Sequence, residues 1–207
     1  MAPRVVVLDY GSGNLRSAQR ALARVGADVT VTADLAAARG CDGLVVPGVG
    51  AYAACMAGID ALDAGPVVVE RVRDGRPVLG ICVGMQVLFE AGIEAVHEHG
   101  VVTKGLGLLP GTVTRLDAPV VPHMGWNTVD WPAGSRLGAG ASPGTRYYFV
   151  HSYAGPAAVP GALVATTVHG GQFGAAVESG CLAATQFHPE KSGDAGAALL
   201  SNWVGAL

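Results

Sequence analysis

The sequence predicts an α/β fold in which a central, mostly parallel sheet is covered by helices on both faces. Two observations lead to this prediction. Short apolar runs alternate with segments of helical periodicity through residue 91, an order that is typical of parallel strands joined by crossover helices. From Gly105 onward the pattern changes to short alternating runs separated by turns, which predicts a mixed or antiparallel portion toward the end of the chain.

The first half of the chain supplies four strands, each followed by a helical segment. The strand runs are residues 5–8, 28–32, 43–47 and 77–81, and the helical segments are residues 15–25, residues 34–39, one or two helices within 53–75, and residues 85–91. Asp34 is a typical N-cap for the second helix. Parallel strands are joined by right-handed crossovers, and ligands of such sheets bind outside the carboxyl ends of the strands. We therefore expect functional residues directly after residues 47 and 81.

The second half is predicted to contain six short strands and a closing helix. The strands are residues 111–116, 124–129, 146–150, 163–168, 173–178 and 181–185, and the helix is residues 195–204. Gly170-Gly171 and Ser179-Gly180 are typical hairpin-turn pairs. Residues 91–101 are predicted to form a polar loop, and residues 131–145, rich in Pro, Gly, Ala and Ser, a surface loop. Because the site described below needs residues from both halves, residues 1–207 are predicted to form a single domain.

Composition excludes several classes of protein. No apolar run approaches the ~20 residues that cross a membrane, and the run after Met1 is too short for a signal peptide, so we expect a cytoplasmic protein with no membrane partner. A net charge of −3 without a basic cluster argues against nucleic-acid binding. The four cysteines show no C-x-x-C spacing, which predicts neither a zinc site nor a disulfide framework. His97 and His99 lack a completing ligand, so we expect them to face solvent and to bind no metal.

The strand at residues 77–81 runs into Gly80-Ile81-Cys82-Val83-Gly84, the cysteine form of a nucleophile elbow. Such a turn forces the nucleophile into a strained backbone conformation, and the flanking glycines avoid Cβ clashes. We expect Cys82 to stand at the carboxyl edge of the sheet with its sulfur exposed. The start of the following helix would favour the thiolate. The alternative is a buried structural cysteine.

A general base for this cysteine is available in the segment His188-Pro189-Glu190. A nucleophilic thiol needs a base, and the base needs a third group that fixes its tautomer. His188 is the predicted base, and Glu190 is predicted to accept the proton of its other ring nitrogen. The alternative for any single histidine is an ordinary hydrogen-bonded residue.

A loop with almost no side chains, Gly48-Val49-Gly50, follows the strand at residues 43–47. It opens at the same sheet edge as Cys82, so we predict that it forms an oxyanion hole together with the N–H of Val83. The alternative is an ordinary glycine-rich turn. A dinucleotide site at Gly11-x-Gly13 is not expected, because position 16 of the fingerprint is arginine.

These motifs resemble those of the triad-type, class I glutamine amidotransferases. Asp9 to Asn14, Pro47 to Gly50, the block Pro122-His123-Met124-Gly125-Trp126-Asn127 and His188 to Ser192 resemble, more narrowly, the glutaminase subunits of imidazole glycerol phosphate synthase. The resemblance runs from about residue 5 to residue 203. Position 83 is valine where relatives usually carry leucine, a conservative change at a position where only the backbone N–H is expected to act.

The resemblance implies a flavodoxin-like three-layer αβα sandwich that hydrolyses glutamine to glutamate and ammonia. It implies a heterodimer with a (β/α)₈-barrel cyclase, which uses the ammonia to make imidazole glycerol phosphate and an aminoimidazole carboxamide ribotide in histidine biosynthesis, and it implies no cofactor. The expected substrate-binding residues are Gln86, Glu94, Ser152 and Tyr153, and the expected partner-interface residues are Asn14, His123, Met124, Trp126, Asn127, Tyr148 and Lys191. Two alternatives stay open, the glutaminase subunit of a different amidotransferase and a non-catalytic scaffold of the same fold.

Overall fold

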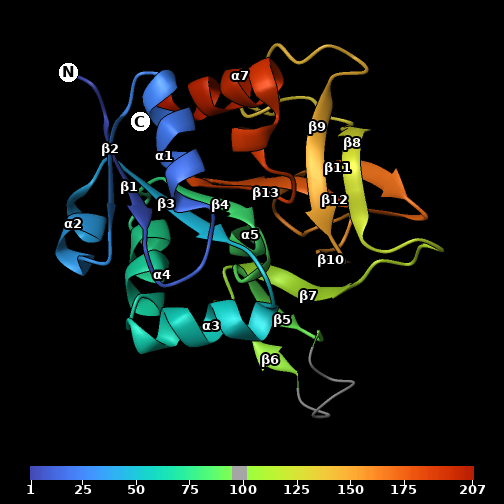
Figure 1. The fold of residues 1–207 in the computed structure, drawn as a ribbon, viewed down its shortest axis with the longest axis horizontal. Coiled ribbons are helices and arrows are strands. Elements are labelled where there is room, and N and C mark those ends of the chain that lie inside the picture. The colour runs from blue at the N-terminus through green and yellow to red at the C-terminus, as the bar shows by residue number, and fades with distance from the viewer. Residues whose placement is uncertain (95–101) are drawn as a thin grey trace.

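The structure is a computed structural model that describes residues 1–94 and 102–207. Its centre is a seven-stranded sheet with the strand order β11-β12-β13-β4-β3-β1-β2 (Figure 1). The strands from β13 to β2 pair in parallel, whereas β11 and β12 pair antiparallel. The predicted mostly parallel sheet with an antiparallel portion is thereby confirmed. The sheet consists of β1 (Arg4–Leu8), β2 (Asp28–Thr32), β3 (Gly43–Gly48), β4 (Val78–Cys82), β11 (Leu163–His169), β12 (Gly171–Ser179) and β13 (Leu182–Thr185).

Helices cover both faces of this sheet. In Figure 1, α1 and α7 lie together above the sheet, and α3 and α4 lie below it. Asp34 caps α2 as predicted, since its side chain accepts a hydrogen bond from the Ala36 N–H at 2.8 Å. The helices are α1 (Leu15–Arg24), α2 (Leu35–Gly40), α3 (Tyr52–Ala61), α4 (Gly65–Arg73), α5 (Val83–Gln86), the 3₁₀ turn η1 (Pro189–Lys191) and α7 (Gly193–Val204).

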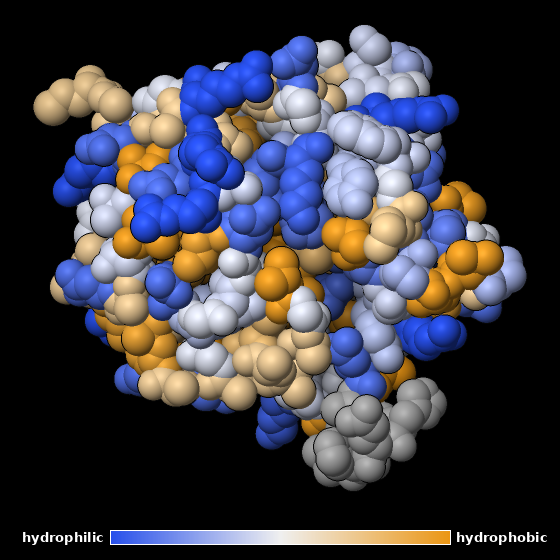
Figure 2. All heavy atoms as spheres, viewed as in Figure 1, coloured by the Kyte–Doolittle hydropathy of each residue, from blue (hydrophilic) through white to orange (hydrophobic). Residues whose placement is uncertain are grey.

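Two smaller sheets flank the central one. A four-stranded sheet has the order β10-β7-β5-β6, and a two-stranded antiparallel ribbon consists of β8 and β9. Apolar side chains appear at the right-hand edge of Figure 2, the side on which this ribbon and the β11–β12 hairpin lie in Figure 1. The strands of the smaller sheets are β5 (Phe89–Gly92), β6 (Thr103–Lys104), β7 (Leu109–Arg115), β8 (His123–Thr128), β9 (Arg146–His151) and β10 (Tyr153–Ala154).

The register of the central strands brings the predicted site together. Gly48 at the end of β3 is the register partner of Cys82 at the end of β4. On the other side of β4, Thr185 of β13 is the partner of Ile81, so the chain that follows β13 leaves the sheet at the same edge. The carboxyl edge of β3, β4 and β13 therefore carries the glycine loop, the elbow and the segment that leads to His188.

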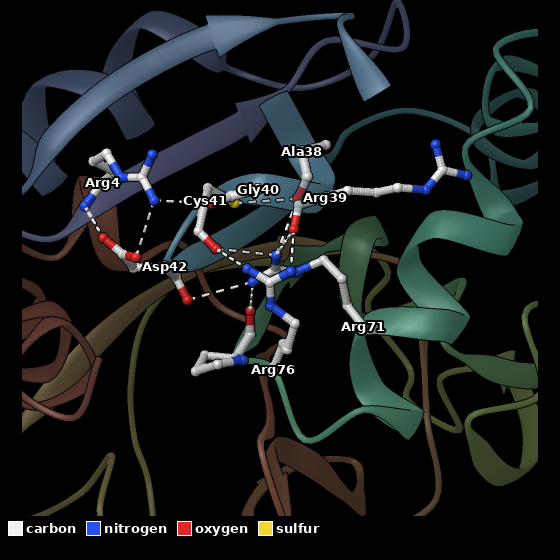
Figure 3. Close-up of polar contacts among 9 residues, drawn as sticks. Arg4, Ala38, Arg39, Gly40, Cys41, Asp42, Arg71 and Arg76 are labelled. Carbon is white, nitrogen blue, oxygen red and sulfur yellow. Dashed lines mark hydrogen bonds and ion pairs between the residues drawn. The ribbon is translucent and has the colours of Figure 1, made fainter. Parts of the chain in front are cut away.

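A buried arginine holds β3 and β4 together at their opposite ends (Figure 3). The Arg71 guanidinium donates to the carbonyl oxygens of residues 38, 39, 41, 42 and 77 at 3.0–3.3 Å. These carbonyls belong to the end of α2, the start of β3 and the residue before β4. Five hydrogen bonds compensate much of the free energy of burying a charge, although that burial lowers the pKa of Arg71. Arg71 thus fixes the two strands whose far ends carry Gly48 and Cys82.

The predicted helix at residues 85–91 is wrong. The helix after the elbow, α5, has only four residues, and the chain enters β5 at Phe89. Residues 87–89 are fully buried, and a short apolar run of this kind fits a strand as well as a helix. The pairing of Phe89 with Leu109 of β7 decides for the strand. Most of the predicted polar loop, including His97 and His99, lies outside the described residues.

Among residues 1–94 and 102–207, no single helix has the length and apolar character of a membrane span, and the only combination that passes on length and composition is the sharply bent pair α3 and α4. The described part of the chain contains no group of three or more His, Cys, Asp or Glu side chains arranged to hold a metal ion.

Candidate active site

Cys82 has the strained backbone that the elbow motif predicts. Its φ of 57° and ψ of −115° lie in a region that L-residues rarely occupy. The flanking glycines allow the close approach of the neighbouring strand, because a Cβ atom on Gly84 would lie 1.9 Å from the Val46 carbonyl oxygen. A Cβ atom on Gly48 would lie 2.4 Å from the Gly84 nitrogen. The turn therefore packs directly against β3, and its conformation is fixed by sterics.

Two details of the predicted elbow need correction. Cys82 is only 3% exposed, and it lines a cavity of about 310 Å³. The helix that follows has a single turn, and the macrodipole of so short a helix is small. Stabilisation of a thiolate must therefore come mainly from side chains around the cavity.

His188 and Glu190 form the predicted pair beside this cavity. His188 Nδ1 lies 2.7 Å from Glu190 Oε1, and the two side chains are only 2% and 3% exposed. The His188 main chain is held at both ends, since its N–H donates to the Tyr148 carbonyl at 2.9 Å and its carbonyl accepts from the Ser192 hydroxyl at 2.7 Å. With Nδ1–H donated to Glu190, the other ring nitrogen is the one available to Cys82.

The electrostatics of the pair favour a charged imidazole. Burial alone would lower the pKa of His188, but the hydrogen bonds to Cys82 and Glu190 outweigh burial and raise the pKa to about 9. A protonated His188 at neutral pH would stabilise a thiolate at Cys82 and could give its proton to a leaving group. The arrangement suits acyl transfer through a covalent thioester.

Comparison with known proteins agrees with this geometry. Residues 6–206 match the family glutamine amidotransferase class-I. The chain belongs to this family. It is 61% identical over its whole length to the complete imidazole glycerol phosphate synthase subunit HisH of Thermobifida fusca, and 62% identical, again over its whole length and 99% of the relative, to the protein of the same name from Mycobacterium bovis.

Solved structures of other amidotransferases share the fold. One described as a glutamine amidotransferase superposes with a TM-score of 0.76 over 98% of this chain and 99% of the other, at 20% identity. A protein from Thermoplasma acidophilum, described as part of a putative GMP synthase, gives a TM-score of 0.70 over 99% and 94% of the two chains, at 22% identity. At such identities the likeness concerns the fold alone.

The predicted oxyanion loop is held by a residue that the sequence did not single out. The Val49 N–H donates to the Ser12 hydroxyl at 3.1 Å, and that hydroxyl donates back to the Val49 carbonyl at 2.9 Å. The Tyr10 hydroxyl, in the same loop as Ser12, donates to the Pro47 carbonyl. In this conformation the Val49 N–H is engaged by Ser12 rather than offered to Cys82. Turning this N–H toward Cys82 requires rotation of the planar Gly48–Val49 peptide, and the absence of a side chain on Gly48 removes one obstacle to that rotation.

The predicted substrate-binding residues line the cavity together with Cys82. Gln86, Glu94, Ser152 and Tyr153 all contribute to its wall. Gln86 Nε2 donates to the Tyr153 carbonyl at 2.7 Å and to Gln186 Oε1 at 3.0 Å. Glu94 accepts a hydrogen bond from the Tyr52 N–H at the start of α3, which ties this wall to the helix. Gln186 is fully buried and was missed, although a polar residue next to the predicted base was a visible signal.

The predicted partner residues divide into exposed and buried ones. Met124 and Trp126 are 64% and 53% exposed. The Trp126 ring meets the Tyr148 ring edge-on at 5.9 Å, and Lys191 Nζ lies 6.0 Å from the centre of the Tyr148 ring. His123 is only 5% exposed, so its ring lies beneath this surface and not on it. Asn14 is half-buried at the N-cap of α1, and Asn127 is half-buried on β8.

Proposed function

We propose that this chain, as a single domain, is the glutaminase subunit of an imidazole glycerol phosphate synthase. Cys82, His188 and Glu190 would form its catalytic triad. The observation that carries the proposal is that the strained, buried Cys82 and His188 line one cavity, with Glu190 hydrogen-bonded to Nδ1 of His188 at 2.7 Å. The full-length relatives at about 60% identity bear the name of that synthase subunit.

In the first half-reaction, the Cys82 thiolate attacks the side-chain carbonyl carbon of glutamine and a carbon–sulfur bond forms. The electron pair of the carbonyl moves to its oxygen, where the N–H of Val83 and an N–H of the Gly48–Gly50 loop would stabilise it. As the oxyanion collapses, the carbon–nitrogen bond breaks. The protonated His188 transfers its proton to the departing nitrogen, so ammonia leaves and a γ-glutamyl thioester stays on Cys82.

In the second half-reaction, the now neutral His188 removes a proton from water. The resulting hydroxide attacks the thioester, the carbon–sulfur bond breaks, and glutamate departs while the thiolate and the imidazolium form again. Glu190 stabilises the imidazolium before and after each transfer and keeps the ring oriented. Because the contact between Glu190 and Nδ1 of His188 is short and buried, the imidazole ring needs little reorientation in either step.

The partner would be the cyclase of the synthase, a (β/α)₈ barrel that consumes the ammonia in histidine biosynthesis. The cluster of exposed Met124, Trp126 and Lys191 around the half-buried Tyr148 supports a docking surface, since tryptophan and tyrosine are enriched in interface hot spots. Lys191 and Cys82 line the same cavity, so a partner bound to this cluster would cover the cavity mouth. The engagement of the Val49 N–H by Ser12 supports a low activity before the partner docks.

The test is to supply the purified chain with candidate synthase subunits and to measure glutamate release. We expect stimulation by the imidazole glycerol phosphate synthase cyclase and none by the synthase subunits for pyridoxal phosphate, nucleotides or aromatic amino acids. Stimulation by one of these other subunits would support the alternative amidotransferase. Failure of a glutamine-mimicking affinity reagent to label Cys82 would favour a non-catalytic scaffold.

A further inference from the structure

A continuous chain of buried and partly buried hydrogen bonds connects the β8 strand to the nucleophile. It begins at Asn127, whose Nδ2 lies 3.3 Å from His123 Nε2. His123 Nδ1 lies 3.3 Å from His151 Nε2, and His151 Nδ1 lies 2.9 Å from the Tyr153 carbonyl. The same carbonyl accepts from Gln86, and Gln86 donates onward to Gln186. Gln186 Nε2 ends the chain 3.9 Å from the Cys82 sulfur.

The direction of every bond in this chain is determined by groups that can only accept. The Tyr153 carbonyl requires Nδ1 of His151 to carry its proton and requires Nε2 of Gln86 to face it. Since Gln86 Nε2 is a donor, Gln186 must present its oxygen to Gln86. Its own Nε2 is then left for Cys82. On the other side, the Val168 carbonyl accepts from Asn127 Nδ2 at 3.0 Å, which fixes that amide as well.

The two imidazoles complete the chain only when both are neutral. His151 then accepts at Nε2 from His123 Nδ1–H, and His123 accepts at Nε2 from Asn127. Burial lowers the pKa of His123 to about 4 and that of His151 to about 3. The nearby His169 ring, stacked on His123 with its centroid at 4.3 Å, is a second and smaller cause of both lowered pKa values. Both rings are therefore neutral at physiological pH.

We propose that Gln186 is a positioning residue of the glutaminase site, which donates an N–H to the Cys82 sulfur and fixes the direction of the Gln86 amide. The neutral pair of His123 and His151 supports the same direction of the Gln86 amide through the shared Tyr153 carbonyl. The inference rests on the proposed function. With both Nε2 protons of Gln86 committed, its carbonyl oxygen is the polar atom left for the cavity. An acceptor there can take an N–H of the glutamine carboxamide and would repel the carboxylate of the product glutamate.

The experiment compares the variant Gln186→Met with the matched control Gln172→Met. Methionine keeps the length of the side chain but removes its donor and its acceptor. Gln172 is an exposed residue whose described side-chain hydrogen bond is to Thr166 at 3.0 Å. Alkylation of Cys82 by iodoacetamide is followed by mass spectrometry of its peptide across a pH series. This readout needs neither glutamine nor a partner.

In Gln186→Met we expect alkylation at pH 7 to slow about fivefold, because a long N–H···S contact of 3.9 Å is expected to contribute no more than one ordinary hydrogen bond. The pH profile should move to higher pH with its upper plateau unchanged. The KM for glutamine should rise by a similar factor when the partner is present, while Gln172→Met matches the wild type in both. An unchanged alkylation profile in Gln186→Met would overturn the proposal, even if glutamine hydrolysis is intact. A shifted profile in a chain that no synthase partner stimulates would instead count against the proposed function alone.

A second measurement on the wild-type chain decides the matter if Gln186→Met does not fold. Nitrogen-15 NMR of labelled histidines should show that His123 and His151 are both neutral, with the proton on Nδ1 and a bare Nε2. A proton on Nε2 of either ring would break the chain as described and refute the proposal.

Discussion

Removal of the Ser12 hydroxyl tests how the oxyanion loop is restrained. In Ser12→Ala the Val49 N–H loses its hydrogen bond at 3.1 Å, and the Val49 carbonyl loses the one at 2.9 Å but keeps the contact with Cys55 Sγ at 3.4 Å. Each is expected to contribute about 0.5–1.5 kcal/mol net, and water replaces part of that, so the conformation with the engaged N–H should lose about 1.4 kcal/mol. Such a loss corresponds to about a tenfold shift toward conformations in which the N–H can face Cys82.

We therefore expect Ser12→Ala to raise the kcat of the isolated chain for glutamine about tenfold. This increase in kcat stays below the ~10²–10³-fold effect of a complete oxyanion-hole donor, because the remaining contacts of the loop still hold it. Activity with the cyclase partner should change little, since the bound partner would already favour the turned peptide. The assay is glutamate release at saturating glutamine, with and without the partner.

Ser17→Ala is the matched control, because Ser17 lies on α1 and its described side-chain hydrogen bond is with Arg20 at 3.4 Å. It should leave the basal kcat unchanged. If Ser12→Ala leaves basal activity unchanged, or lowers activity with the partner, Ser12 supports the productive loop and the reasoning is wrong.

Three further predictions follow from the site. Glu190→Gln should lower kcat by at most about 10⁴-fold, less than Cys82→Ala, and a larger loss in steady-state assays would show that Glu190 holds the substrate or the fold. The pKa of His188 is raised to about 9 from 6.5, so its protonation stabilises the fold by about 3 kcal/mol at most, fully below pH ~6.5 and not above pH ~9. The free energies of urea unfolding of the wild type and of His188→Gln should therefore converge as the pH rises. A difference that stays constant with pH would contradict the assignment. Trp126→Ala should weaken cyclase binding about 30-fold, as loss of a hot spot of about 2 kcal/mol would, with little change in Tm because Trp126 is 53% exposed. A marked loss of Tm with unchanged affinity would show that Trp126 stabilises the fold and does not contact the partner.

The central strands and the helices between them could be predicted from the sequence because each carries its own local signal. The runs in β1 to β4 are apolar and short, and α1 shows clear helical spacing. At residues 87–89 the local signal fitted both helix and strand, and the outcome depended on the pairing of Phe89 with Leu109. Such pairings between distant segments are not encoded in local periodicity.

The same distinction applies to the candidate site. Cys82 and the His188–Glu190 pair have local motifs, so their neighbourhood at the carboxyl edge of β4 could be predicted. Ser12 lies in the Asp9–Asn14 block and Gln186 lies two residues before His188, but neither could be given a role from the sequence, since their roles arise from contacts with residues 37 and 104 positions away. The burial of the His123 ring could not be predicted for the same reason, because the sequence of this strand does not determine which of its two faces packs against the core. Tertiary packing alone decided which face that was.

The most direct test of the account is the behaviour of Cys82→Ala in complex with the cyclase partner. Cys82 is one small side chain that lines a cavity, so the variant should fold and bind the partner like the wild type. We expect synthesis driven by glutamine to disappear and synthesis driven by added ammonia to continue at the wild-type rate. Glutamine hydrolysis that persists near the normal rate in this variant would contradict the assignment of the nucleophile, and with it the proposed function of the site.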